Sequence, residues 1–173
     1  MKIITYNNSL NVSDTLEHFL DQVAQQGSWY GGGSVSALSA ALAAALLEKL
    51  LGSAGPVKRL TRIRRECLHL ARQDAVVFAR VIAASRSGNR RAFGRTLKAA
   101  TDIPCRVFEH AGAIRAISRE AASSIKPQFR ADVVSARAMA AAAAEGAQAL
   151  ITTNLGWLND RTYTRTIRRR LSR

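Results

Sequence analysis

The sequence is short of aromatic residues, cysteine and acidic residues, and each shortage narrows the class of protein. Aromatic side chains make up only 6% of the 173 residues, although 47% are hydrophobic and many of these are alanine. β-Sheets favour aromatic and β-branched residues, whereas alanine is the strongest helix former, so the composition predicts closely packed helices. The two cysteines, Cys67 and Cys105, lie in apolar helical settings without a paired spacing. We therefore expect reduced core thiols in a cytoplasmic protein rather than a disulfide framework.

Residues that bind metals or form nucleophilic triads are also scarce. The three histidines, His18, His69 and His110, are dispersed along the chain, and the two cysteines are distant from each other. Such spacing offers no metal-ligand set, and no Ser-His-Asp or Cys-His arrangement stands out. We therefore expect no metal site.

Membrane and export signals are missing from the sequence as well. Residues 1–5 carry no long apolar segment, so we expect no signal peptide. Residues 35–51 are apolar but include Glu48 and Lys49, and they fall short of the ~20 apolar residues that a membrane span needs. This run is interpreted as a buried helix, and no membrane partner is expected.

The sequence shows helical periodicity throughout. Apolar residues recur at three- and four-residue intervals, and no segment has the alternation of a strand. The sequence predicts one all-α domain over residues 1–173, a bundle of about six to seven helices. Helices are expected at about 13–27, where Ser13 is a plausible N-cap, and at about 34–52, 56–85, 91–100, 102–123 and 132–153. After an interruption or kink at residues 154–156, a strongly basic C-terminal helix is expected within residues 158–173.

Three consecutive glycines stand before the second of these helices. Gly31, Gly32, Gly33 and Ser34 lead directly into the apolar run. Consecutive glycines lose much backbone entropy on folding, and they suit a backbone that comes close to a ligand or to another backbone. The free N–H groups at a helix N-terminus suit an anion, so the segment is a candidate ligand cradle. The alternative is a tight turn between helices in which Ser34 is the N-cap.

Charge of one sign dominates the chain. It holds 26 Lys and Arg against 12 Asp and Glu, a formal net charge of +14. No acidic residue occurs between Asp74 and Asp102, and the tail after Asp160 holds six arginines and no acid. Such a surface attracts anions, including nucleic acid, although it could equally be a solvated basic face.

Four stretches in order resemble the cyclodeaminase family, meaning the cyclodeaminase half of formiminotransferase-cyclodeaminase and the free-standing methenyltetrahydrofolate cyclohydrolases. Residues 31–38 resemble the PGGGS opening and its Ala/Leu helix, and residues 74–78 resemble a mid-helix D-x-x-A-F-like element. Residues 99–104 resemble an A-T-x-x-P helix start, and residues 132–147 with 153–155 resemble the closing S-D, A-A-x-x-G-A and N-L elements. The resemblance covers about residues 14–160. Tyr30 stands where the family usually has proline, and the chain is shorter and more basic than typical members.

The resemblance implies a helical homodimer that binds a tetrahydrofolate derivative near the subunit interface. The implied activity is either formimidoyltetrahydrofolate cyclodeaminase, which closes 5-formimino- to 5,10-methenyl-tetrahydrofolate and releases ammonia, or methenyltetrahydrofolate cyclohydrolase. Neither reaction requires a metal or redox cofactor. Both pass through a tetrahedral carbon between two nitrogens, where a side chain has to move a proton.

Two carboxylates and one amide are the candidates for this chemistry. Asp74 lies on the apolar stripe of a long helix, where burial would raise its pKa, and it is the first candidate acid–base or pterin-anchoring group. Its alternative is a buried ion pair or interhelix hydrogen bond. Asp132 is the second catalytic candidate, although its position also suits an N-cap. Asn154 could bind a pterin edge or could mark a helix end.

Cations are needed for the glutamate carboxylates of folate, and Arg62, Arg65 and Lys98 are candidates. Two other functions stay open. One is a non-catalytic basic helical dimer of the same ancestry that binds a polyanion such as nucleic acid; few aromatics are available for base stacking. The other is a structural dimer whose alanine faces only form an interface.

Overall fold

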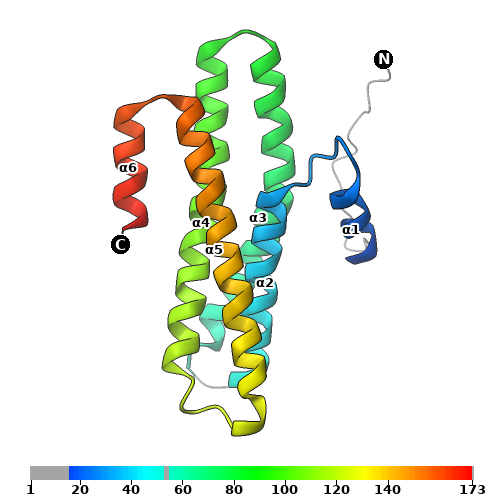
Figure 1. Cartoon of the computed structure of the whole chain (residues 1–173), viewed down its shortest axis with the longest axis vertical. Coiled ribbons are helices and arrows are strands. Elements are labelled where there is room, and N and C mark those ends of the chain that lie inside the picture. The colour runs from blue at the N-terminus through cyan, green and yellow to red at the C-terminus, as the bar shows by residue number, and fades with distance from the viewer. Residues whose placement is uncertain (1–15, 53–54, 173) are drawn as a thin grey trace.

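The computed structural model describes residues 16–52 and 55–172 and confirms an all-α fold in that part of the chain. Four helices form an antiparallel bundle in which neighbours in sequence alternate in direction (Figure 1). They are α2 (Gly32–Leu51), α3 (Val57–Arg86), α4 (Arg90–Glu120) and α5 (Arg130–Leu158), and a 3₁₀ turn at Pro127–Phe129 precedes α5. The shorter helices α1 (Leu16–Ala24) and α6 (Arg161–Leu171) lie outside the bundle.

Small residues bring α2 and α5 close together in the centre of the bundle. The buried alanines of both helices belong to one core cluster, which Leu47, Leu60 and Ile114 extend toward α3 and α4. A Cβ atom on Gly146 of α5 would lie 2.3 Å from Ser36 Oγ of α2, so glycine is what permits this approach. By length and composition α2 could cross a membrane, but its inward face packs against the other bundle helices.

The two outer helices are attached differently. On α6, Ile167 is buried against Cys105 of α4 and Ile151 of α5. In contrast, α1 has no buried residue, and its Phe19 ring meets the Tyr30 ring edge to face at 5.5 Å. The buried positions of Cys67 and Cys105 confirm that both are free core thiols.

Two predicted helix boundaries are wrong because tertiary packing overrides local signals. Pro104 was expected near a helix start, but α4 runs continuously through it while Leu97, Ile103 and Val107 pack inward on both sides. Proline removes one helical hydrogen bond, and the buried apolar residues offset that loss. Likewise α5 continues through residues 154–156, so no break or kink residue is needed there.

Two predicted capping roles and one predicted helix start also need correction. Ser34 is the third residue of α2 rather than its N-cap, which is Gly31. Asp132 lies inside the first turn of α5, where a carboxylate favours the helix dipole without acting as the cap. The basic C-terminal helix starts at Arg161 with Asp160 as its N-cap, whose Oδ1 accepts from the Tyr163 N–H at 2.9 Å. The expected cap at Ser13 lies outside the described residues.

The bundle is incomplete at one end because α2 is shorter than its neighbours. Ser34 at the start of α2 lies against Asp74, and α3 continues for twelve more residues. At 1.5 Å per residue this extension is about 18 Å long. Beyond the N-terminus of α2, helices α3, α4 and α5 therefore enclose a space that no fourth bundle helix fills (Figure 1).

Candidate functional site

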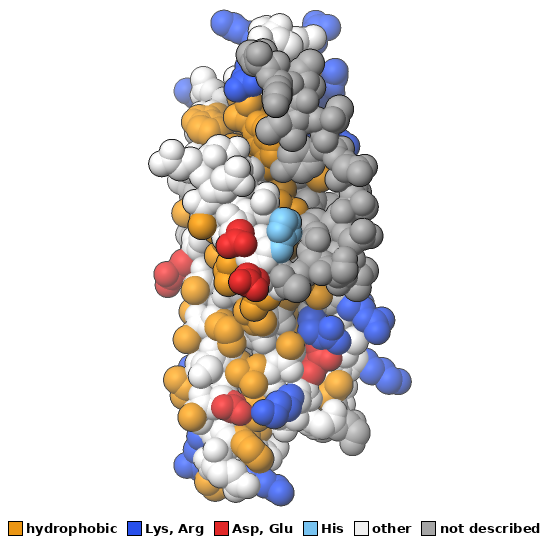
Figure 2. Space-filling model, turned by 90° about the vertical axis from the view of Figure 1, so that its right-hand side faces the viewer, with side chains coloured by type: hydrophobic (Ala, Val, Ile, Leu, Met, Phe, Trp, Pro, Cys, Tyr) orange, Lys and Arg blue, Asp and Glu red, His pale blue; other side chains and the backbone are white. Residues whose placement is uncertain are grey.

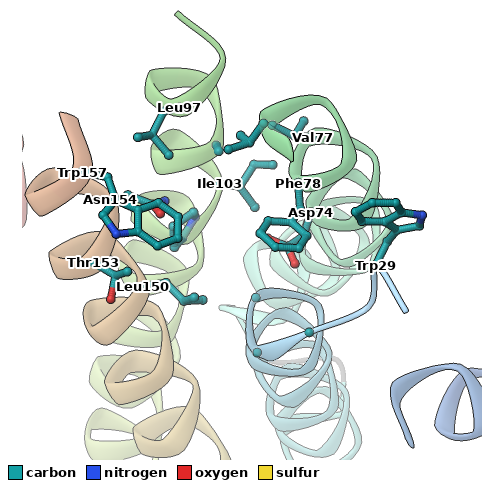
Figure 3. A pocket seen from close by; sticks show the side chains of 16 residues that line it. Trp29, Asp74, Val77, Phe78, Leu97, Ile103, Leu150, Thr153, Asn154 and Trp157 are labelled. Atoms are coloured by element: carbon teal, nitrogen blue, oxygen red, sulfur yellow. The ribbon is translucent and has the colours of Figure 1, made fainter. Parts of the chain in front are cut away.

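A cavity of about 170 Å³ occupies the space beyond the N-terminus of α2. One side is formed by the segment before α2 and by α3, and the opposite side by α4 and α5 (Figure 3). The lining residues are Trp29, Gly31, Gly32, Gly33, Asp74, Val77, Phe78, Val81, Leu97, Ala100, Ile103, Pro104, Leu150, Thr153, Asn154 and Trp157. Most of them are apolar, and the few polar groups lie on facing walls.

Aromatic side chains stand at the two sides of the opening. Trp29 lies on the α3 side, where its ring meets Phe78 edge to face at 6.1 Å, and Trp157 lies across the cavity on α5 (Figure 3). These are the only two tryptophans of the sequence. Trp157 is 57% exposed and Phe78 is 40% exposed, so large apolar rings border the cavity without being covered. Such rings favour a flat, partly apolar ligand.

Asp74 is the single acidic residue among those that line the cavity. Its Oδ2 accepts a hydrogen bond of 3.1 Å from the Ser34 hydroxyl. Burial raises the pKa of the carboxyl above its usual value, while the hydrogen bonds from Ser34 act in the opposite direction. The outcome is a half-buried carboxyl whose pKa is raised above its usual value, which suits a group that takes part in proton transfer.

Gly33 explains why the carboxyl can lie so close to α2. A Cβ atom at this position would be 2.2 Å from Asp74 Oδ1 and 2.5 Å from its Cγ. By contrast, Cβ atoms on Gly31 and Gly32 would meet no protein atom within 4 Å. The first glycines thus leave backbone open toward the cavity, and the third makes room for Asp74.

The wall made by α4 and α5 carries hydrogen-bonding groups opposite Asp74. Thr153 and Asn154 line the cavity from α5, and the Thr153 hydroxyl donates to the Ala149 carbonyl at 3.1 Å. On α4, Pro104 has no N–H, so the Ala100 carbonyl lacks its helical donor four residues on, and both residues line the cavity. This wall can therefore offer an amide and a backbone carbonyl to a polar ligand edge.

The structure brings together some of the residues expected from the sequence and separates others. Gly31, Gly32, Gly33, Asp74 and Asn154 line one cavity, and Ser34 supports Asp74 from behind.

The other candidates lie elsewhere in this chain. Asp132 is 22 residues before Asn154 on α5, which places it about 33 Å away along the helix. Arg62 and Arg65 are exposed on α3, and Arg65 is nine residues, or about 13 Å, before Asp74. Lys98 lines a separate cavity on α4 and pairs with Asp160 at 2.8 Å.

Sequence reasoning missed the aromatic rim and the α4 carbonyl. Trp29 precedes the glycines, and Trp157 follows Asn154 by three residues, which is close to one helical turn. Their closeness in sequence to these candidate residues was the signal that could have indicated both tryptophans. Among residues 16–52 and 55–172, no three His, Cys, Asp or Glu side chains gather in a way that could hold a metal ion.

Comparisons with known proteins bear on the family and on the fold of the chain. The family model described as formiminotransferase-cyclodeaminase matches residues 15–53 and 54–173. Among solved structures, the crystal structure of a formiminotetrahydrofolate cyclodeaminase from Thermotoga maritima is similar, with a TM-score of 0.82. The two chains are 22% identical over 92% of this chain and 87% of that one. The comparison with curated proteins finds no match.

Proposed function

The chain belongs to the formiminotransferase-cyclodeaminase family, and on that basis we propose that it is an enzyme acting on a one-carbon derivative of tetrahydrofolate. The reaction is either closure of 5-formimino-tetrahydrofolate to the 5,10-methenyl form with release of ammonia, or hydrolysis of the methenyl form. The observation that carries this proposal is the apolar cavity beyond the N-terminus of α2, which Asp74 and Asn154 line from opposite sides.

The cavity suits the flat ring system of a folate. Apolar side chains such as Val77 and Ile103 contact the faces of the ring, and the aromatic rim covers it from solvent. Asn154 and the Ala100 carbonyl bind polar atoms at the ring edge, since each offers hydrogen-bonding capacity on the same wall.

Asp74 is the proposed proton-transfer group. In the closure reaction, N10 attacks the carbon of the protonated formimino group (–CH=NH₂⁺) and loses its proton. The resulting –NH₂ group gains that proton and leaves as ammonia, so the 5,10-methenyl cation remains. A carboxylate at this point can accept the N10 proton and deliver it to the leaving nitrogen, so one group serves both transfers. The Ser34 hydroxyl holds the carboxylate in place during this exchange. The scheme uses no metal and no cofactor besides the folate itself.

One chain provides only part of the proposed binding site. The cavity volume of about 170 Å³ is below the roughly 300–1,000 Å³ of a complete ligand pocket. No Lys or Arg of the described residues lines the cavity to meet the glutamate carboxylates. The glutamate end therefore extends out of this cavity toward other cationic groups.

A second copy of the chain is the proposed source of the remaining surface. Hydrophobic side chains are spread over the lower half of one face of the bundle (Figure 2). On the adjacent helices α2 and α5, Leu42 is 47% exposed and Val134 is 64% exposed, and Ala138 and Ala142 are also exposed. A homodimer would cover such an apolar face.

Sedimentation velocity should therefore show a particle of twice the 18.7 kDa chain mass at micromolar concentration. The substitution Leu42→Glu should shift the protein to the monomer, because a dimer would bury the new charge in its interface. The exposed Arg115→Glu is the matched control and should leave the dimer intact. A wild-type monomer throughout the concentration range would contradict the dimer.

The activity itself is tested by assaying both reactions with the purified protein. We expect ammonia release and methenyl formation from 5-formimino-tetrahydrofolate, or accelerated hydrolysis of 5,10-methenyl-tetrahydrofolate, well above the uncatalysed rate. Heat-inactivated protein is the blank for the spontaneous reactions. Failure to accelerate either reaction would remove the catalytic proposal.

A further inference from the structure

Exposed arginines gather on the side of the molecule formed by α6 and the first turns of α4. We name as the arginine ridge the residues Arg90, Arg91 and Arg95 of α4 with Arg165, Arg168 and Arg169 of α6, all of them exposed. The α4 members line a second cavity of about 310 Å³ together with Lys98, Leu158 and Asp160. Because Asp160 is the N-cap of α6, this cavity joins the two helices.

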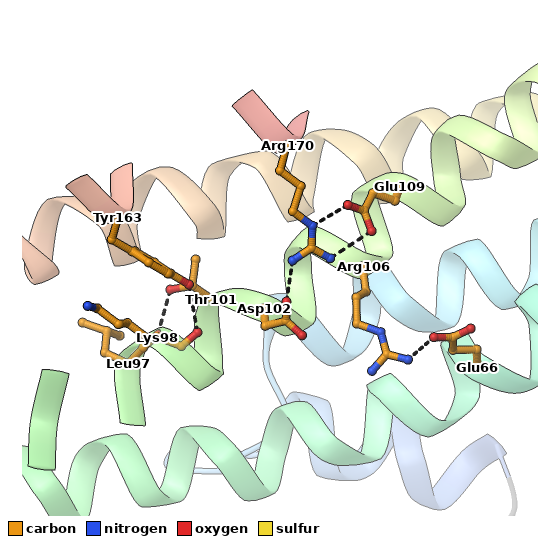
Figure 4. Close-up of polar contacts among 9 residues, drawn as sticks. All are labelled: Glu66, Leu97, Lys98, Thr101, Asp102, Arg106, Glu109, Tyr163 and Arg170. Atoms are coloured by element: carbon orange, nitrogen blue, oxygen red, sulfur yellow. Dashed lines mark hydrogen bonds and ion pairs between the residues drawn. The ribbon is translucent and has the colours of Figure 1, made fainter. Parts of the chain in front are cut away.

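The α6 helix lies firmly along α4. Near its start, the Tyr163 hydroxyl donates to the Lys98 carbonyl at 3.2 Å. Near its end, Arg170 pairs with Glu109 and Asp102 of α4 (Figure 4). The underside is apolar, where Ile167 is buried. The arginines therefore project from a fixed helix rather than from a loose tail.

The charges of the ridge are not neutralised within the described protein. Its nearest acidic residues are already paired: Asp160 with Lys98, and both Asp102 and Glu109 with Arg170. Among residues 16–52 and 55–172, none of the six ridge arginines forms an ion pair. Six uncompensated guanidinium groups on two neighbouring helices produce a positive potential that an extended polyanion can match.

The chemistry and length of the arginine ridge indicate which kind of polyanion it binds. Guanidinium groups bind phosphate oxygens in bidentate fashion, whereas insertion into a lipid surface needs an exposed apolar face, which α6 has buried. The eleven residues of α6 span about 16 Å. Double-stranded nucleic acid carries one phosphate charge per about 1.7 Å of axis when both strands are counted, so a duplex segment as long as α6 carries about nine charges on its two strands.

We propose that the arginine ridge binds double-stranded nucleic acid through its phosphate backbone, without sequence preference. No aromatic side chain belongs to the ridge, so base stacking contributes nothing and the phosphates supply the affinity. This inference does not depend on the folate chemistry, because the ridge and the first cavity share no residue.

The test is fluorescence anisotropy with a labelled 20-base-pair duplex of random sequence between 50 and 200 mM salt. The expected dissociation constant is ~10⁻⁶–10⁻⁴ M, with log K falling against log salt at a slope of about −4. The ridge variant Arg165→Gln/Arg168→Gln/Arg169→Gln should bind about tenfold more weakly at 50 mM salt with a shallower slope. Its fold is checked by circular dichroism.

A matched variant, Arg59→Gln/Arg72→Gln/Arg115→Gln, removes three exposed arginines away from the ridge. It should bind within threefold of the wild type. Equal weakening in both variants would overturn the ridge as the binding surface, and so would failure to bind the duplex at 50 mM salt. Binding to anionic phosphatidylserine vesicles but not to the duplex would overturn nucleic acid as its partner.

Discussion

Replacing Asp74 by asparagine should reduce turnover of the tetrahydrofolate substrate by about 10²–10⁴-fold, the usual contribution of a general acid–base group. Asparagine has nearly the same shape and can still accept the hydrogen bond from Ser34, but it cannot exchange a proton. The measurement is steady-state kinetics over a range of pH. A variant with wild-type turnover would remove Asp74 from the mechanism.

The same substitution should leave the fold at least as stable at neutral pH. Burial raises the pKa of Asp74 in the folded chain above the unfolded value of about 3.9. Between these two pKa values the folded state binds more protons, so the free energy of unfolding falls as pH rises through that window. The Asp74→Asn variant has no ionisable group at this position, so its free energy of unfolding does not fall in this way. Urea unfolding from pH 4 to 8 should show that the difference between variant and wild type grows in favour of the variant as pH rises.

Adding a single methyl group at Gly33 should also abolish most activity. In Gly33→Ala the new Cβ would lie 2.2 Å from Asp74 Oδ1, so the carboxylate has to move away from Ser34. Displacing a catalytic group by about 1 Å can reduce the rate by 10²-fold, and overpacking of this kind costs about 1–3 kcal/mol of stability. We expect turnover to fall by about 10²-fold and the urea midpoint to decrease.

The matched control is Gly112→Ala on α4, where an added Cβ meets nothing within 4 Å. This glycine lies in a helix far from the cavity, so alanine should raise stability by about 1 kcal/mol through helix propensity and leave turnover unchanged. If Gly33→Ala behaved like Gly112→Ala, the close approach between α2 and Asp74 would have no functional role.

Much of the fold could be predicted from the sequence because helical, alanine-rich periodicity persists over long segments. Local signals failed where packing outweighed them: α4 passes through Pro104 because the residues around it are buried, and α5 passes through Gly156. Propensity describes one segment at a time, whereas these helices are stabilised by their neighbours.

The candidate site was predictable only in part. The sequence indicated Asp74 as a carboxylate on an apolar stripe, and the three glycines as a segment that loses much backbone entropy on folding. The contact between Gly33 and Asp74 could not be predicted, because it joins residues 41 positions apart. Trp29 and Trp157 come from opposite ends of the chain and belong to no common pattern. The sequence could not assign a binding role to surface arginines such as Arg62. Periodicity predicts which face of a helix a residue lies on, but not which other helix or ligand that face contacts.

Calorimetric titration of the wild-type protein with 5-formyl-tetrahydrofolate, a stable folate, tests the central claim most directly. The account predicts saturable binding with one site per chain at moderate salt, and the same binding in the control variant Gly112→Ala. Absence of binding to the wild-type protein would contradict a folate site in the cavity between α2, α3, α4 and α5.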